Sequence, residues 1–247
     1  METALYLIPV TLGAVPQDQV LPDYNRTIIS QISHFIVEEE RTARRFLKAA
    51  IPSIDINALT FYPMGKHADA ALFRQYLALL LEGQSMGVIS EAGCPAVADP
   101  GADIVSIAQG LRLRVIPLVG PCSILLALMA SGMNGQNFAF NGYLPSHESD
   151  RAAAIRRLEA RSQSEGQTQI FIETPFRNAQ MLETLLSQLH SSTRLCIAAG
   201  ITCPEEFIRT MTVAEWRKTS LPELRKVPAI FLLSSSFQRR PSNKGRR

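Results

Sequence analysis

A short buried strand that ends in a loop of glycine, proline and acidic residues is the feature that most limits how this chain can fold. The stretch Gly87–Gly101 reads GVISEAGCPAVADPG and joins a predicted strand over Met86–Ile89 to a predicted helix over Ala102–Gln109. Gly93 and Gly101 permit backbone conformations that side chains forbid, and the two prolines stiffen the loop. In open α/β folds, ligands bind at the carboxyl edge of the sheet, where such loops lie. We therefore interpret this stretch as a cofactor-binding loop.

Strand-like and helix-like runs alternate through the first half of the chain, which is typical of parallel βαβ units. The predicted strands cover Leu5–Val10, His34–Glu39, Ala58–Tyr62, Met86–Ile89 and Leu113–Leu118. The predicted helices cover Arg26–Ser33, Arg41–Ala50, Ala68–Leu81 and Ala102–Gln109. This order predicts an N-terminal α/β domain over residues 1–118 with a mostly parallel sheet.

After Gly120 and Pro121 the pattern changes, and closely spaced strands indicate an antiparallel part. The predicted strands of this half cover Phe138–Tyr143, Gln169–Ile172, Leu195–Ala199, Glu206–Thr212 and Ala229–Leu233. Its predicted helices cover Ser123–Ala130, Asp150–Arg161, Phe176–Leu189 and Val213–Arg217. The fold class is therefore α/β, with a second α/β domain over residues 119–238 that contains a mixed sheet.

The composition fits a globular protein, because 46% of the residues are hydrophobic and 19% are charged. No apolar run reaches the ~18 residues that a membrane span needs, and the N-terminal METALYLIPV does not read as a signal peptide. The cysteines and histidines form no zinc pattern, so no metal site is predicted. We expect a cytoplasmic protein without membrane association whose four cysteines stay reduced: Cys94, Cys122, Cys196 and Cys203.

Positive charge gathers at the C-terminus. Residues 239–247 carry five basic and no acidic side chains, which take the net charge of the chain from −2 to +3. We expect a basic, disordered tail that is simply solvated, and the alternative is that it helps to hold a nucleic acid. The charge by itself does not indicate a nucleic-acid-binding protein.

Two carboxylates, Glu91 and Asp99, lie in the first loop. They suit a ligand with positive charge or many hydrogen-bond donors, and they would repel a pyrophosphate. Neither a GxxxxGKS/T loop nor a GxGxxG loop occurs, so the usual nucleotide phosphate-binding motifs are missing. The alternative is a tight strand–helix turn in which Asp99 only caps the helix that starts near Gly101.

Two further loops follow predicted strands. In Val119–Ser123, Ser123 could cap the next helix, contact a ligand, or do both, and its residue type favours the cap. In the segment Ile170–Arg177, a strand ends at Glu173 and Pro175 is expected to open a helix. Glu173 and Arg177 could form a surface ion pair worth well under ~1 kcal/mol, or a polar group aimed into an interdomain cleft.

At these loops the chain resembles the tetrapyrrole methylase superfamily, the class III S-adenosylmethionine methyltransferases. It is most similar to the 16S rRNA (cytidine-2′-O-)-methyltransferase branch, which methylates a ribose 2′-oxygen in small-subunit ribosomal RNA. The long loop is highly specific, and the other motifs are strong in this order. The matching motifs are LYLIPVTLG at Leu5–Gly13, VEEERTARRFL at Val37–Leu47, Gly87–Gly101, VIPLVGPCSILLALMASG at Val115–Gly132, FNGYLP at Phe140–Pro145 and FIETPFRN at Phe171–Asn178.

The resemblance implies a cleft between the two domains that holds S-adenosyl-L-methionine, and a homodimer. By position in the motifs, it implies cofactor contacts from Leu12, Gly93, Cys94, Pro95, Val97, Ser123, Ile124, Ile172, Ala198 and Ala229. A ribose hydroxyl would benefit from a nearby base, and no histidine lies in a motif. The catalytic candidates are therefore Glu173, Glu91 and Asp99.

The chain departs from this branch on the substrate side. It has Thr11–Ala14 for Ile-Gly-Asn-Leu, Glu38–Thr42 for an acidic-Asp-Thr-Arg run, Ser90–Pro95 for SDAGTP, and Ala199–Cys203 for Arg-Glu-Leu-Thr-Lys, and it largely lacks a His/Asn-rich segment near Lys66–Ala70. The lost arginine and lysine weaken the case for an RNA phosphate backbone. Ribosomal RNA or the small ribosomal subunit remains the expected partner. The alternatives are a tetrapyrrole-like or other small molecule as acceptor, or a non-catalytic cofactor-binding homologue.

Overall fold

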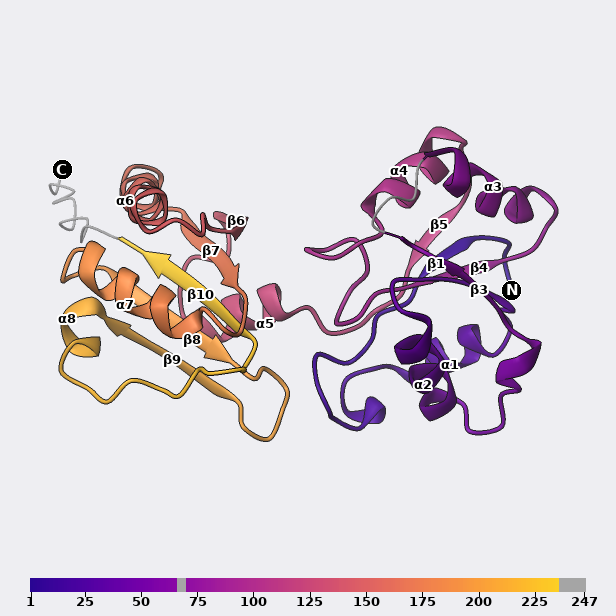
Figure 1. Cartoon of the computed structure of the whole chain (residues 1–247), viewed down its shortest axis with the longest axis horizontal. Coiled ribbons are helices and arrows are strands. Elements are labelled where there is room, and N and C mark those ends of the chain that lie inside the picture. Colours follow the sequence, from indigo (N-terminus) through magenta and orange to yellow (C-terminus); the bar gives the residue numbers. More distant parts are fainter. Residues whose placement is uncertain (66–69, 236–247) are drawn as a thin grey trace, which may run out of the picture. The chain divides into compact units, whose positions relative to one another are not determined.

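The computed structural model describes residues 1–65 and 70–235. The chain divides after Cys122 into two compact units, each with its own five-stranded sheet (Figure 1). The tail expected at residues 239–247 lies outside the described residues, as do the first two residues of the helix expected over Ala68–Leu81.

The sheet of the first unit, predicted to be mostly parallel, is parallel throughout. Its order is β3-β2-β4-β1-β5. The strands are β1 (Leu5–Leu7), β2 (His34–Val37), β3 (Thr60–Pro63), β4 (Met86–Ile89) and β5 (Val115–Pro117). Strand β1 is shorter than the predicted Leu5–Val10, because Pro9 has no N–H to donate to a neighbouring strand.

Helices cover both faces of this sheet (Figure 1). They are α1 (Asp23–Ile29), α2 (Glu40–Ala50), α3 (Ala70–Leu81) and α4 (Ala102–Gly110), with 3-10 turns η1 (Gln17–Gln19) and η2 (Ile56–Ala58). Alternate strand residues divide between the faces: Phe35 packs with Leu47 of α2, whereas Ile36 packs with Leu77 of α3. The helix expected over Arg26–Ser33 begins three residues earlier, because Pro22 takes the residue position just before the helix.

The crossovers that follow β1 and β4 leave the sheet on opposite faces. Strand β1 is followed by α1 and β4 by α4, and these two helices pack on different sides of the sheet (Figure 1). Since β1 and β4 are hydrogen-bonded neighbours, their carboxyl ends flank a topological switch point. Ligands of open α/β sheets bind at such a point.

The second unit contains the predicted mixed sheet, in the order β6-β7-β10-β8-β9. Strands β6 and β7 are parallel, and the other neighbouring pairs are antiparallel. The strands are β6 (Phe138–Tyr143), β7 (Thr168–Glu173), β8 (Arg194–Ala199), β9 (Phe207–Thr212) and β10 (Ala229–Ser234). The fold class predicted from the sequence, α/β with a parallel and a mixed sheet, is confirmed.

The helices of the second unit pack on its sheet. They are α5 (Ser123–Ser131), α6 (Glu148–Glu165), α7 (Asn178–Gln188) and α8 (Val213–Trp216). Helix α5 is tied to the sheet by Thr210, whose Oγ1 donates to the Ser131 carbonyl oxygen at 2.8 Å. The prediction that Pro175 opens α7 is wrong: residues 174–177 form a turn, and the helix begins at Asn178.

We expect Gly87→Ala to destabilise the protein by about 1–3 kcal/mol. A Cβ atom at this central position of β4 would lie 2.6 Å from Ile8 Cδ1 and 2.9 Å from Phe35 Cδ1. Urea unfolding measures the effect. Gly110→Ala is the matched control, since a Cβ there meets nothing within 4 Å and alanine favours a helix. Equal free energies of unfolding for the two variants would show that the packing around β4 has room for a methyl group.

Candidate functional site

Three loops meet at the carboxyl edge of the parallel sheet. The Val10 N–H donates to the Gly93 carbonyl oxygen at 2.9 Å, which joins the loops after β1 and β4. The Cys94 thiol lies 3.4 Å from the Pro121 carbonyl oxygen, which joins the loops after β4 and β5. A Cβ on Gly93 would lie 3.0 Å from Leu12 Cδ2. The loops that follow β1, β4 and β5 therefore lie together at this edge.

The long loop after β4 holds an uncommon backbone conformation. Ala96 and Ala98 have positive φ angles of 67° and 61°, and Gly101 has a φ of 125°. The loop closes on itself, since the Ala96 N–H donates to the Pro100 carbonyl oxygen at 3.2 Å and the Val97 N–H to the Cys94 carbonyl oxygen at 3.3 Å. Non-glycine residues in this region cost free energy and are concentrated at functional sites.

Three carboxylates gather at this edge: Glu38 after β2, and Glu91 and Asp99 after β4. The Glu91 N–H donates to Glu38 Oε2 at 3.2 Å, and the Thr42 hydroxyl donates to Glu91 Oε1. Burial raises the pKa of Glu38 above its usual value; the Glu91 N–H opposes this shift, and the charges of Asp99 and Glu91 add to it. Burial also raises the pKa of Asp99, against the Ser90 hydroxyl and the Ala92 N–H that face it, and the Glu91 charge adds to the rise.

The alternative in which Asp99 caps α4 is wrong. Gly101 precedes that helix and no side chain within residues 1–65 and 70–235 caps it, while the Asp99 carboxylate faces Ser90 and Ala92. Glu38 was missed as a site residue in the sequence. Its position directly after β2 was the available signal, because β2 is the neighbour of β4 and parallel strands end at one edge.

A small pocket of about 150 Å³ lies beside these carboxylates, at the switch point. Its wall comes from the segment after β1, from the end of β4 and from α2: Val10, Thr11, Ile89, Ser90, Glu91, Thr42, Ala43 and Phe46. The pocket can therefore hold a small group that carries positive charge or hydrogen-bond donors.

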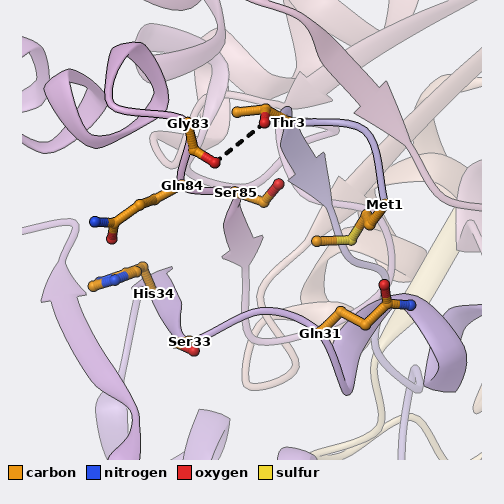
Figure 2. Close-up of a pocket in the computed structure, with 8 residues that line it drawn as sticks. All are labelled: Met1, Thr3, Gln31, Ser33, His34, Gly83, Gln84 and Ser85. Atoms are coloured by element: carbon orange, nitrogen blue, oxygen red, sulfur yellow. Dashed lines mark hydrogen bonds between the residues drawn. The ribbon is translucent and has the colours of Figure 1, made fainter.

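A second pocket, of about 460 Å³, lies at the opposite, amino edge of the same sheet (Figure 2). Thr3, Ser85 and His34 contribute to its wall, and the Thr3 hydroxyl donates to the Gly83 carbonyl oxygen at 3.2 Å. Among the residues that the structure describes, no carboxylate or guanidinium side chain lines it. Because ligands of such sheets bind at the carboxyl edge, this pocket is not the candidate site.

The residues expected to contact the cofactor from the second unit do not all share a face of its sheet. Ile230 of β10 pairs with both Ile172 and Ala198, so these side chains point to one face. Ala229 is one residue away, and its side chain packs in the core on the other face. Ser123 is the first residue of α5, so the capping position falls on Cys122 rather than on the predicted Ser123. Ile124 follows it and is buried.

Glu173 and Arg177 form the predicted ion pair, with Arg177 Nη2 at 2.6 Å and Nε at 3.0 Å from Glu173 Oε1. The expectation of a surface pair is wrong, since the Glu173 side chain is 1% exposed and that of Arg177 is 35% exposed. Glu173 Oε2 is buried without a hydrogen-bond partner within residues 1–65 and 70–235. The carboxylate is thus held in the unit by one of its two oxygens.

Two further properties bear on function. Among the described residues, no group of three or more His, Cys, Asp and Glu side chains could hold a metal ion. No helix in the part of the chain that the structure describes is long and apolar enough to cross a membrane.

Comparison with known proteins gives the relatives of the chain. No protein-family model matches it. Ribosomal RNA small subunit methyltransferase I of Escherichia coli O157:H7 is 29% identical over 211 residues, which cover 85% of this chain and 70% of that protein. The protein of the same name from Micromonospora olivasterospora is 32% identical over 206 residues, which cover 83% of this chain and 62% of that protein.

Solved structures of methyltransferases share the architecture. The methyltransferase CobJ matches with a TM-score of 0.61 and 15% identity, over 94% of each chain. Cobalt precorrin-4 methyltransferase, CbiF, matches with a TM-score of 0.59 and 12% identity, over 94% of this chain and 95% of that one. The chain has the tetrapyrrole methylase fold and is a distant homologue of ribosomal RNA small subunit methyltransferase I.

The relatives also bear on the class of enzyme and on the cofactor. The homologues and the structural neighbours of this chain are methyltransferases. Uroporphyrin-III C-methyl transferase from Thermus thermophilus, with a TM-score of 0.53, 16% identity and coverage of 94% of this chain and 97% of that one, was solved with S-adenyl homocysteine. The predictions of an S-adenosylmethionine-dependent methyltransferase and of its cofactor are thereby confirmed at the level of the family.

We expect Asp99→Asn to raise the melting temperature by a few degrees at pH 7.5. Burial raises the pKa of Asp99 in the folded state, so its ionised form opposes folding above the pKa of the unfolded chain, and the neutral amide removes that cost. The gain should shrink as the pH falls and vanish below ~4, where the aspartate is protonated in both states. Thermal unfolding at several pH values measures this. A gain that persists undiminished at pH 3.5 would contradict the explanation.

Proposed function

We propose that this protein transfers a methyl group from S-adenosyl-L-methionine to a ribose 2′-oxygen of small-subunit ribosomal RNA. One observation carries the proposal: the match to ribosomal RNA small subunit methyltransferase I extends over 85% of the chain. The solved tetrapyrrole-type methyltransferases are 12–17% identical and support the fold alone. A cytoplasmic location, the small ribosomal subunit as partner and a homodimer belong to the same proposal.

The donor set at the edge of the parallel sheet fits this cofactor. S-adenosyl-L-methionine carries an ammonium and a sulfonium but no phosphate, so it suits the carboxylates of Glu38, Glu91 and Asp99. When bound, it supplies an activated methyl group. Leu12, Gly93, Cys94, Pro95 and Val97 would contribute close-packed backbone beside it, since Gly93 has no room for a side chain against Leu12. The remaining contacts proposed are Ser123, Ile124, Ile172 and Ala198, together with the backbone of Ala229, whose side chain packs in the core.

The acidic cluster also supplies a base for a hydroxyl acceptor. A carboxylate whose pKa is raised toward neutral takes up a proton more readily, and this applies to Asp99 and Glu38. Glu173 is the other carboxylate proposed from the sequence, but its Oε1 is held by Arg177 and its side chain is buried. We therefore propose that Asp99 accepts the ribose proton, with burial and the charge of Glu91 raising its pKa.

Methyl transfer tests the function directly. We expect the protein to transfer label from methyl-labelled S-adenosyl-L-methionine to small ribosomal subunits from a strain that lacks the protein. Digestion to nucleosides should place the label on a ribose 2′-oxygen. Subunits from the parent strain are the control and should accept little label, because their site is already methylated. Label found only in a small molecule would replace RNA with a tetrapyrrole-like acceptor, and cofactor binding without transfer would indicate a non-catalytic homologue.

The base has its own test. Asp99→Asn should lower kcat by about 10²–10⁴-fold, as the loss of a general base does, and leave cofactor affinity within a few-fold. Asp103→Asn is the matched control, since Asp103 is exposed in the first turn of α4, four residues further on. A kcat for Asp99→Asn equal to that of the control would exclude Asp99 as the base and leave methyl transfer itself in place.

A further inference from the structure

A pocket of about 770 Å³ adjoins the small acidic pocket in the first unit. Thr11 and Phe46 line both pockets, so the two meet along the segment after β1 and the side of α2. Gln17, Asp18, Arg26 and Arg45 complete the polar part of the larger wall. We propose that this pocket binds a nucleotide of the RNA substrate that neighbours the reacting one. The inference rests on the function proposed above.

Positive charge in the pocket suits a phosphate. Arg45 is exposed on α2 and forms no ion pair with any carboxylate of the described chain. Its neighbour along the helix, Arg44, is held by Glu40 at 2.7 Å, and Arg26 is held by Asp23 at 2.9 Å. Arg45 is therefore the guanidinium in this wall that has its full hydrogen-bonding capacity available, and a planar guanidinium binds phosphate oxygens well.

Phe46 and Gln17 supply the contacts that a nucleotide base needs. Phe46 is half-buried, so its ring forms a fixed apolar wall on which a base can stack. Gln17 Nε2 donates to the Phe46 carbonyl oxygen at 3.1 Å, which fixes the amide beside the ring. Gln17 Oε1 is buried without a hydrogen-bond partner in the described ranges. A buried acceptor without a partner destabilises the folded state, and an amino group of a base would satisfy it.

The volume and the position of the pocket favour this occupant over the cofactor. About 770 Å³ lies within the ~300–1,000 Å³ range of small-molecule sites. None of the ten residues proposed to contact S-adenosyl-L-methionine belongs to its wall. Glu91 lines the acidic pocket, whereas the guanidinium of Arg45, unpaired among the described residues, lines the larger one. A cationic donor and an anionic acceptor chain therefore have separate places that meet at Thr11 and Phe46.

The experiment compares Arg45→Ala with Arg74→Ala in the full chain. Arg74 is an equally exposed helical arginine of the same unit, on α3 at the other face of the sheet. Binding of small-subunit ribosomal RNA is followed by fluorescence anisotropy at several salt concentrations, and binding of S-adenosyl-L-methionine by calorimetry. We expect Arg45→Ala to weaken RNA binding by about threefold to tenfold and to lower the salt slope by about 1, as loss of one phosphate contact does. Arg74→Ala should leave both unchanged, and neither variant should alter cofactor affinity.

Crosslinking locates the contact independently. RNA that contains 4-thiouridine should crosslink to the peptide that contains Phe46, and Arg45→Ala should reduce that product. Equal RNA affinities for the two arginine variants, or crosslinks confined to other peptides, would overturn the pocket while RNA methylation by the unaltered chain upheld the proposed function. Failure of the unaltered chain to bind or methylate RNA would overturn both, and loss of cofactor binding in Arg45→Ala would assign the pocket to the cofactor instead.

Discussion

The first unit depends on how tightly its loops interlock at the carboxyl edge of the parallel sheet. Gly120 lies so close to Pro9 that a Cβ would be 2.2 Å from the proline Cγ, and the proline ring is too rigid to move aside. The Val10 N–H binds the Gly93 carbonyl oxygen one residue further along the same segment. The loops that follow β1 and β4 are therefore joined by a backbone hydrogen bond, and those that follow β1 and β5 by the packing of Pro9 against Gly120. Most side chains of the long loop take no part in these two contacts and can shape a site.

Three carboxylates lie close together at this edge of the sheet, and their mutual repulsion destabilises the folded state. Glu38 and Asp99 are partly buried next to Glu91, and burial raises the pKa of both. Like charges held close together destabilise the folded state. A bound cofactor with two cationic groups would offset this repulsion, and a carboxylate with a raised pKa would serve a hydroxyl acceptor that must lose a proton. The same three carboxylates thus explain why the unit would bind one kind of ligand and repel polyphosphates.

Local pattern was enough to predict most elements of the fold. Strands β4 and β6 were predicted residue for residue, and the apolar run of β4 is bounded by polar residues at both ends. Helix α1 begins three residues earlier than predicted, because Pro22 directly precedes its first turn.

The site was harder to predict. Which residues belong to it depends on which strands are neighbours in the sheet, and on which face of the sheet each residue of a strand points to. Glu38 lies in the carboxylate cluster because β2 pairs with β4. Ala229 points to the opposite face from Ile172 and Ala198 because it is one residue out of register with them. The burial of Glu173 likewise depends on the packing of its own unit, and a short sequence motif carries no information about that packing.

The alanines at positions 96 and 98 carry a consequence for kinetics. Both hold a left-handed backbone that an alanine seldom adopts in a flexible chain, and closing hydrogen bonds keep the loop there. The entropy of ordering this segment is therefore lost when the chain folds, so a ligand does not lose it again on arrival. Association with such a loop proceeds at the rate of encounter, without waiting for rearrangement, and differences in affinity between ligands then appear in their residence times.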